Sequence, residues 1–195
     1  MAVLSREEFD AIEFDAVRSG DHAVAAERMN QLAATATETA GMPRAEAFLR
    51  AGEQYLMADD PVAAAGGFRR AMADGGPVFV DPRVGLARAL FQLGRDAEAL
   101  ALIGRLKAEA PADPRVYDLV AELLVDRSDL QGGLAWATAG VELGLRRAEE
   151  ERSRDGDAAG DDDESELRLL LSLRYRIRND LGLPEDNYDQ MLDEA

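Results

Sequence analysis

Apolar residues recur along this chain at helical spacing, in stretches separated by short turn signals. In the clearest stretch Phe48, Ala51, Gly52 and Tyr55 stand at i, i+3, i+4 and i+7, so they share one face of a helix. Asp59, Asp60 and Pro61 then break the helix, and a second apolar face follows at Ala64, Phe68 and Ala71 before Pro77 closes the stretch. The pattern predicts two amphipathic helices joined by a short turn.

The same helical hairpin recurs at a spacing of about 34 residues. Small residues stand about twelve positions apart within each hairpin, at Gly52 and Ala64, Ala87 and Ala99, and Ala121 and Gly133. Turn residues keep the same register, at Gly20, Asp59, Gly94 and Ser128. Because paired helices approach closely only where side chains are small, we expect an all-α fold: an α-solenoid of about four hairpins.

This register resembles the tetratricopeptide repeat, in which an aromatic, Leu-Gly and a second aromatic on one helix precede Ala, aromatic, Ala and a terminal Pro on the next. The third hairpin carries the pattern as Leu86, Ala87, Leu90, Gly94, Ala99, Ile103, Leu106 and Pro111. The fourth carries Tyr117, Val120, Ala121, Leu124, Gly133, Ala137 and Gly140, with Leu145 in place of the proline, and the first carries Phe9, Ile12, Ala16, Gly20, Ala25, Met29 and Leu32. The resemblance places repeats near 6–39, 45–78, 80–113 and 114–147; the alternative is another solenoid of helical pairs. The first repeat departs most, with Glu13 where the family has a small residue and extra residues at 39–43.

The breaks between apolar stretches predict helices near 6–18, 22–38, 44–58, 62–74, 83–93, 96–109, 115–126 and 130–150. Together they form a solenoid over residues 1–150. Residues 151–165 have no apolar side chain larger than alanine, so we expect an acidic flexible linker there.

A C-terminal segment, residues 166–195, follows the predicted linker. Its helix, ending at Gly182, has an apolar stripe at Leu167, Leu170, Leu173, Ile177 and Leu181, and Tyr188, Met191 and Leu192 mark a short tail helix. Since the last repeat of a solenoid leaves an apolar face, we expect the first helix to fold back as a cap, with Trp136 as a candidate contact.

Composition narrows the classes of function. The chain has no cysteine, which removes disulfides, thiolate metal sites and cysteine nucleophiles. The formal charge of −17 disfavours nucleic acid as a partner, although ten acids against two arginines between residues 149 and 166 supply −8 of it. With neither a signal peptide nor a membrane-spanning apolar run in view, a cytoplasmic location is expected.

Lys107 is the one lysine among many arginines, a bias typical of GC-rich bacteria. The tail at 174–188 resembles segments of actinobacterial repeat proteins.

Catalytic chemistry finds little support. His22 is the single histidine and stands at a predicted helix start without a serine, cysteine or metal-ligand cluster spaced around it, so a capping role is the better interpretation. Phosphate-loop, dinucleotide and zinc-protease motifs are absent. We therefore expect a non-enzymatic protein without a cofactor.

One acidic segment has partial calcium-loop spacing. Asp155, Asp157, Gly160, Asp161, Asp163 and Glu166 match loop positions 1, 3, 6, 7, 9 and 12. Ala159 lacks the oxygen ligand expected at position 5, and Asp162 replaces a buried aliphatic residue. A solvated acidic spacer is favoured over a specific calcium site.

Resemblance to the family also suggests where a partner binds, because members hold peptides in a concave groove lined by the first helix of each pair. Carried over residue by residue, the main groove candidates are Phe14, Leu49, Glu53, Leu56, Met57, Val84, Arg88, Phe91, Arg115, Asp118 and Glu122, flanked by Asp10, Val17, Arg18, Gln92 and Val125. The lysines and asparagines that clamp a C-terminal carboxylate in chaperone-binding members are missing, which argues against that ligand. Leu49, Leu56, Met57, Val84 and Phe91 are candidate apolar anchors, and Arg88 and Arg115 candidate carboxylate partners.

Two functions are compatible with these patterns. The leading one is a scaffold or adaptor that binds a peptide or helix of another protein in its groove. The alternative is a self-associating structural module in which the helix at 166–182 docks on another copy, so that the protein is a homo-oligomer.

Overall fold

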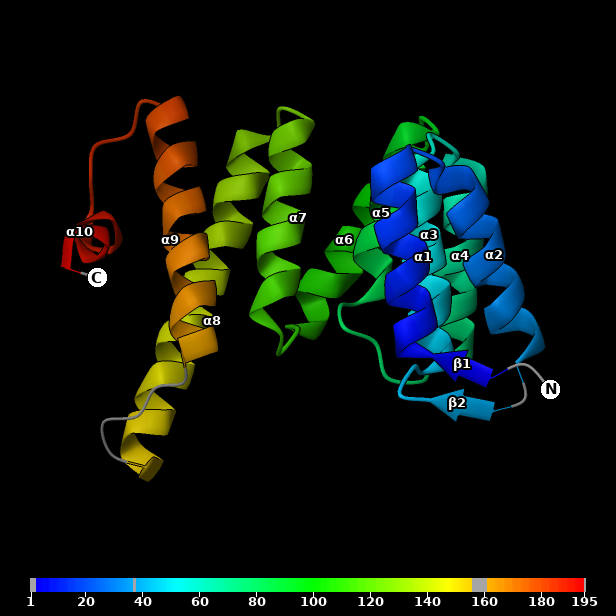
Figure 1. Ribbon diagram of the computed structural model, residues 1–195. Coiled ribbons are helices and arrows are strands. Elements are labelled where there is room, and N and C mark those ends of the chain that lie inside the picture. Colours follow the sequence, from blue (N-terminus) through cyan, green and yellow to red (C-terminus); the bar gives the residue numbers. More distant parts are fainter. Residues whose placement is uncertain (1–2, 37, 156–160, 195) are drawn as a thin grey trace. The chain divides into compact units, whose positions relative to one another are not determined.

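Helices make up most of the chain in the computed structural model, which describes residues 3–36, 38–155 and 161–194 (Figure 1). The chain divides into two compact units, Met1–Ala108 and Glu109–Ala195. The N-terminal unit contains β1 (Val3–Ser5), α1 (Arg6–Ser19), α2 (His22–Thr35), β2 (Glu38–Ala40), α3 (Arg44–Met57), α4 (Pro61–Asp74), α5 (Pro82–Gln92) and α6 (Asp96–Glu109). The C-terminal unit contains α7 (Pro114–Asp126), α8 (Leu130–Asp155), α9 (Asp161–Asp180) and α10 (Asn187–Glu194).

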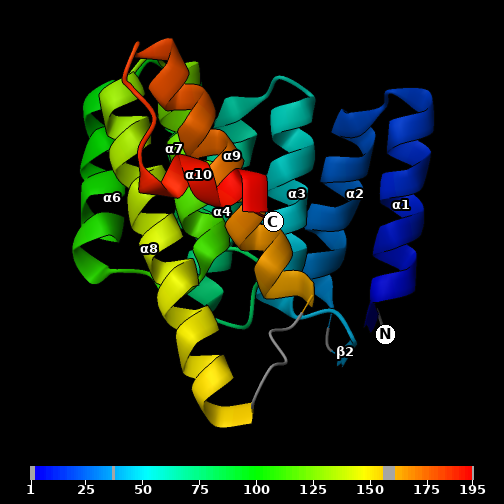
Figure 2. The same cartoon turned by 90° about the vertical axis from the view of Figure 1, so that its left-hand side faces the viewer.

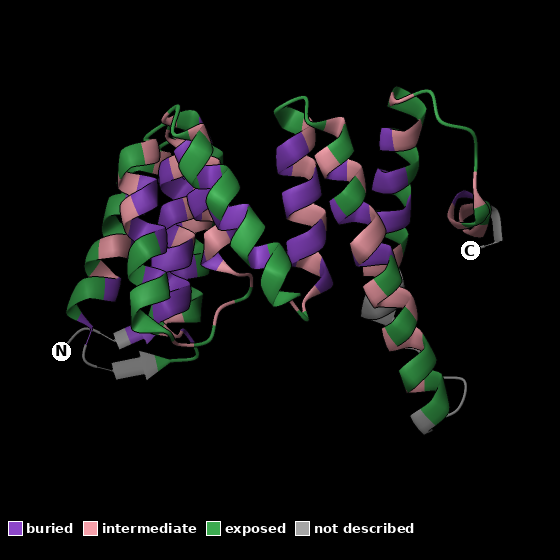
Figure 3. Ribbon diagram, turned by 180° about the vertical axis from the view of Figure 1, so that it is seen from behind, coloured by how far each residue is buried: buried purple, intermediate pink, exposed green. Residues whose placement is uncertain are grey.

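Within the C-terminal unit, α7 to α10 pack on one another in chain order. In the N-terminal unit α1 to α5 pack in chain order, and α5 also contacts α3. The helices have a buried side and an exposed side, which are purple and green in Figure 3. The fully buried side chains of this unit include Leu4, Phe9, Met29, Met42 and Phe68. The all-α arrangement of stacked helical pairs expected from the repeat is confirmed.

Small residues permit the close approach within the pairs, as the repeat predicted. A Cβ added at Gly52 on α3 would lie 2.8 Å from Cε1 of Phe68 on α4, and one added at Gly67 would lie 3.0 Å from Cα of Gly52. In the C-terminal unit, a Cβ at Gly133 on α8 would lie 3.1 Å from the carbonyl oxygen of Ala121 on α7. Any larger side chain at these points would push the helices apart.

The turns inside the hairpins share one backbone conformation. Gly20, Asp59, Gly94 and Ser128 have positive φ angles of 81°, 56°, 70° and 63°. Asp and Ser adopt this left-handed conformation less readily than Gly. Because all four turns have it, the first helix of each pair ends in the same way whether or not the turn residue is glycine. An Asp-Pro pair then starts α4, α5 and α7, where the carboxylates of Asp60, Asp81 and Asp113 accept hydrogen bonds from backbone N–H groups of the first turn.

Two short strands were not expected from the sequence. β1 and β2 pair in parallel, with Val3 opposite Glu38 and Ser5 opposite Ala40. Three residues are too few to show the alternation by which a strand is recognised, so the pattern of the chain gave no signal for them. The extra residues before α3 thus serve to bring the chain back beside its N-terminal segment.

The bounds predicted for the acidic linker, residues 151 and 165, are both wrong. Helix α8 continues to Asp155 and α9 begins at Asp161, so only 156–160 lie between them, outside the described residues. The absence of apolar side chains did not stop the helix, because residues 146–155 contain good helix formers and extend a helix that is already nucleated and packed.

Helix α9 packs on α8 and α7, much as α5 packs on α4 and α3. It therefore occupies the place of the first helix of a further pair, and the expected capping helix is confirmed within one chain. Docking of this helix on a second copy stays a prediction. Helix α10 lies crosswise on α9 within this unit (Figure 2).

Candidate functional site

The groove positions predicted from the family pattern lie on the first helix of each pair, but in both units. Phe14 is on α1, Leu49, Glu53, Leu56 and Met57 are on α3, and Val84, Arg88 and Phe91 are on α5, all in the N-terminal unit. Arg115, Asp118 and Glu122 are on α7 in the C-terminal unit. The predicted groove therefore consists of two separate sets of residues, one in each compact unit.

Three of the predicted apolar anchors are core residues. Leu49 is 2% exposed, Val84 5% and Phe91 7%, so none of them offers a surface to a partner. The reason is that one residue of register turns a side chain by about 100° around a helix, and these three face the neighbouring helices. The prediction that these three residues line the groove is therefore wrong, because they belong to the core.

The exposed apolar residues that remain lie on α1 and α3. Phe14 is 69% exposed and Val17 73% on α1, Met57 is 60% exposed on α3, and Leu56 is half-buried. Arg50 on α3 binds Asp10 and Glu13 on α1, which fixes the level of the two helices. One turn further along each helix lie Phe14 and Val17 on α1 and Glu53 on α3, and Met57 lies one turn beyond Glu53.

The sequence analysis did not predict a role for Arg50. Its guanidinium donates a hydrogen bond of 2.8 Å to Asp10 and also binds Glu13, and it lies 5.9 Å from the centre of the Phe9 ring. The hydrogen bond to Glu13 raises the pKa of Arg50. Glu13, the residue out of place in the repeat pattern, thus joins the first two hairpins by an ion pair. A partner about forty positions away in the chain leaves no local signal in the sequence.

Glu53 is the most perturbed acid of this face. Burial, together with the nearby charges of Glu46 and Glu13, raises the pKa of its carboxyl group to about 7 against the opposing effect of Arg50 and Arg88. Within the described part of the chain, no hydrogen bond or ion pair reaches the Glu53 side chain. The group is therefore a half-buried carboxyl that exchanges its proton near neutral pH.

Arg88 on α5 stands at the corresponding position of the next pair. Glu53 and Arg88 each precede the turn residue of their hairpin, Asp59 or Gly94, by six positions, as Phe14 precedes Gly20. Arg88 is half-buried, and no hydrogen bond or ion pair joins it to another residue among those described. Phe14, Glu53 and Arg88 form what we call the central row of the N-terminal unit.

A shallow pocket of about 330 Å³ lies near the start of α1 and α3. Its walls are formed by Arg6, Asp10, Pro43, Glu46, Arg50, Pro77, Val78 and Phe79. The carboxylate of Glu46 accepts a hydrogen bond of 2.7 Å from the backbone N–H of Phe79, whose side chain is 66% exposed. The pocket has apolar and charged walls but no nucleophile paired with a base.

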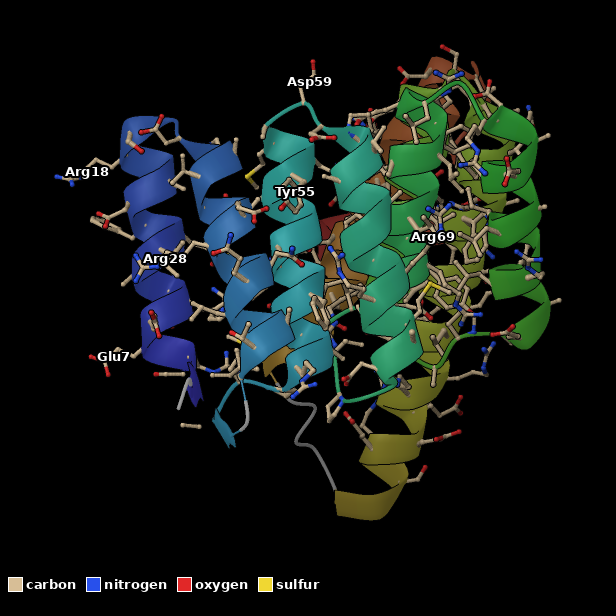
Figure 4. All side chains as sticks on the ribbon, turned by 90° about the vertical axis from the view of Figure 1, so that its right-hand side faces the viewer. Glu7, Arg18, Arg28, Tyr55, Asp59 and Arg69 are labelled. Carbon is tan, nitrogen blue, oxygen red and sulfur yellow. The ribbon has the colours of Figure 1, made fainter. Side chains whose placement is uncertain are left out.

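The opposite side of these hairpins is closed by contacts between neighbouring helices. Figure 4 shows Tyr55 of α3 between α2 and α4, and its hydroxyl donates a hydrogen bond of 2.8 Å to Glu27 of α2. This contact lowers the pKa of Glu27 and, together with burial, raises that of Tyr55 to about 12. His22 at the start of α2 is 2.8 Å from Gln54 of α3. These polar groups join hairpins and form no catalytic arrangement.

In the C-terminal unit, the predicted groove residues face α9. Arg115 bonds Asp113 at 2.9 Å and lies 3.7 Å from Glu166, while Glu122 lies 3.9 Å from Arg176. Burial and the charge of Glu122 raise the pKa of Asp118. Arg115 is thus engaged by carboxylates of its own chain, which corrects its assignment as a carboxylate partner for a ligand.

Neither a metal cluster nor a membrane span is found among the residues that the structure describes. There, no group of three or more His, Cys, Asp or Glu residues is placed to hold a metal ion. The calcium-loop positions centre on 156–160 and on side chains that lie outside the described residues. Within that same part, none of the helices combines the length and apolar character that a membrane span needs.

Comparison with known proteins agrees with this arrangement. The family model described as Tetratricopeptide repeat matches residues 55–123, from the end of α3 to α7. This segment carries tetratricopeptide repeats, so the resemblance read from the sequence is confirmed there. Repeats of this family generally mediate interactions between proteins and are typically not catalytic. Neither the curated proteins nor the solved structures contain a significant match to the chain.

Proposed function

We propose that this protein is a non-enzymatic interaction module that binds a peptide or helix of another protein on the exposed side of α1, α3 and α5. The observation that carries the proposal is the central row, in which Phe14 is exposed and Glu53 and Arg88 have no hydrogen bond or ion pair among the described residues. Large exposed apolar side chains next to unpaired charges are typical of surfaces that bind other proteins.

The apolar part of the surface comes from residues that contribute little to the core. Phe14 and Met57 are more than half exposed, so replacing them with serine removes apolar contact area for a partner and leaves the buried packing intact. A matched control exists on the second helices, where Val24 on α2 is 69% exposed and Val62 on α4 68%. Each of the two double variants therefore removes two exposed apolar side chains.

The test is affinity capture with the full chain, the Phe14→Ser/Met57→Ser variant and the Val24→Ser/Val62→Ser variant as baits. We expect a protein that binds the natural chain and the second variant and is lost from the first. Loss from the Val24/Val62 variant instead would move the binding surface to α2 and α4. A partner held equally by all three baits would contradict the proposal.

A further inference from the structure

Two arginines on α9 hold the acids at the start of α10. Arg174 and Arg178 stand one turn apart, and their side chains are only 5% and 13% exposed. Each guanidinium binds the carboxylates of both Asp186 and Asp189. Arg174 is itself fixed by a hydrogen bond of 3.1 Å from its Nε to Thr138 on α8. The two arginines, which we call the arginine site, thus bind two carboxylates that lie three residues apart in the chain.

The same two carboxylates also cap helix α10. The backbone N–H of Asp186 donates a hydrogen bond of 2.9 Å to the Asp189 carboxylate, and the Asp186 carboxylate accepts one of 3.0 Å from the N–H of Tyr188. These reciprocal bonds have the geometry of a capping box. Because α10 has only eight residues, too few for a stable isolated helix in water, it needs both its cap and the arginines that hold the capping acids. The arginine site therefore recognises the start of an acidic helix.

An exposed connection joins this helix to α9. Gly182 ends α9 with a positive φ of 66°, and residues 183–185 are exposed before Asp186 enters the arginine site. Two copies of a protein can exchange a segment that follows such a hinge, because each site accepts an identical segment from the other copy.

We propose that the arginine site also accepts residues 186–194 of a second copy, so that two chains exchange α10. Every copy carries the two acids at the spacing that the site binds, and an exchanged pair keeps all the ion pairs of the separate chains. A tethered segment has an effective concentration on the order of millimolar, so the chain's own α10 fills the site in dilute solution and exchange increases with protein concentration. This inference concerns the C-terminal unit and is independent of the proposed function.

Two full-length variants with complementary defects test the exchange. Asp186→Asn/Asp189→Asn removes the acids and opens the arginine site, whereas Arg174→Met disables the site and frees the acidic segment. Neither variant has both halves of the contact, but one chain of each can form it. We expect sedimentation equilibrium to show a dimer in the equimolar mixture and monomers for each variant alone. Arg174→Met mixed with Asp180→Asn/Glu185→Gln is the control, since this last variant loses two exposed acids but keeps its own α10 in the site.

A synthetic peptide of residues 183–194 tests the site without an arginine variant. Its fluorescence anisotropy should show saturable binding to the Asp186→Asn/Asp189→Asn chain and at least about tenfold weaker binding to the natural chain, whose site is occupied. Replacing both aspartates of the peptide by asparagine should weaken binding at least about tenfold, because hydrogen bonds to charged groups are lost. Trp136 fluorescence in urea shows whether the receptor variant keeps a folded C-terminal unit.

Three outcomes overturn the inference. They are the lack of a mixed dimer from folded variants, equal binding of the aspartate and asparagine peptides, and a lack of saturable peptide binding to both the folded variant and the natural chain. Each of them leaves the proposed function unaffected, because that function is tested on α1 and α3.

Discussion

The guanidinium of Arg174 on α9 donates a hydrogen bond of 3.0 Å to the carboxylate of Asp189 on α10, and the two residues are only 4% and 6% exposed. Arg174 also reaches Asp186 at 3.0 Å and Thr138 of α8 at 3.1 Å, and Arg178 binds Asp189 at 2.9 Å. The ring of Tyr188 stacks 4.8 Å from the Arg174 guanidinium. Charged groups thus hold α10 on α9.

Replacing Arg174 by methionine should release α10. Breaking one side of a buried ion pair costs about 3–5 kcal/mol, because Asp189 would be left buried without a counter-charge. Undocking of the short helix limits that cost, so we expect fast hydrogen exchange in residues 187–194 with a smaller change in the free energy of unfolding of the C-terminal unit. Arg176→Met is the control, since Arg176 is exposed and 3.9 Å from Glu122. Slow exchange in α10 of the Arg174 variant would refute this account.

The docking of α10 should also weaken in acid. Hydrogen bonds from Arg174 lower the pKa of Asp186 from 3.8 to about 2. A lowered pKa in the folded state means that the stabilisation is present above about pH 4 and is lost as pH falls toward 2. Hydrogen exchange of residues 187–194 should therefore accelerate over that window, relative to the intrinsic exchange rate. An Asp186→Asn variant should show less of this change.

The ionisation of Glu53 should give the free energy of unfolding the opposite dependence on pH. Its pKa is raised from 4.5 to about 7, so the unfolded chain loses the proton before the folded protein does, and stability falls as pH rises from about 4.5 to 7. Glu53→Gln removes this loss and should raise the free energy of unfolding at pH 8 by about 1–3 kcal/mol, with little effect at pH 4. Urea unfolding at both pH values measures it, with exposed Glu7→Gln as control. A variant less stable than the natural chain at pH 8 would show that the carboxylate has a stabilising partner.

Glycine substitutions should separate helix contacts from helix propensity. Gly52→Ala places a methyl group 2.8 Å from Phe68 and should cost about 1–3 kcal/mol through overpacking. Gly66→Ala on α4 meets only the flexible end of Arg70 at 3.9 Å, and should stabilise by about 0.5–1 kcal/mol because alanine restricts the unfolded chain. Thermal unfolding followed by circular dichroism compares the two. Equal effects would mean that helices α3 and α4 adjust freely.

The docking of α9 can be followed through Trp136, the single tryptophan of the chain. Trp136 is 2% exposed and its ring centre lies 5.3 Å from that of Tyr117, so its fluorescence reports on the C-terminal unit. Ile177 of α9 is fully buried and faces Gly133 of α8, and Ile177→Ala should cost about 2–5 kcal/mol. Leu169→Ala, at a site 61% exposed on the same helix, should change the fluorescence midpoint little. An unchanged midpoint for Ile177→Ala would show that α9 is not part of the packed unit.

Local patterns were sufficient to predict the helices and turns. Apolar spacing within a helix depends on residues three or four apart, and the turn at Gly20, Asp59, Gly94 and Ser128 depends on a few neighbouring residues. The small residues at Gly52 and Gly133 also followed from the repeat, because each hairpin must satisfy the same packing requirement. The extension of α8 to Asp155 was missed, since composition alone does not account for helix propagation.

Which side chains of the first helices are available to a partner was decided only by tertiary structure. Leu49, Val84 and Phe91 share the apolar character of Phe14 and Met57, yet packing against neighbouring helices buries the first three and leaves the other two exposed. The ion pairs of Arg50 with Glu13 and of Arg174 with Asp189 join residues of different helices, and the pKa of Glu53 is raised by burial together with the charges of Glu46 on α3 and Glu13 on α1. The sequence by itself thus determined the repeating helices, because their causes are local, whereas the proposed binding face depends on the environment that several helices create around each group.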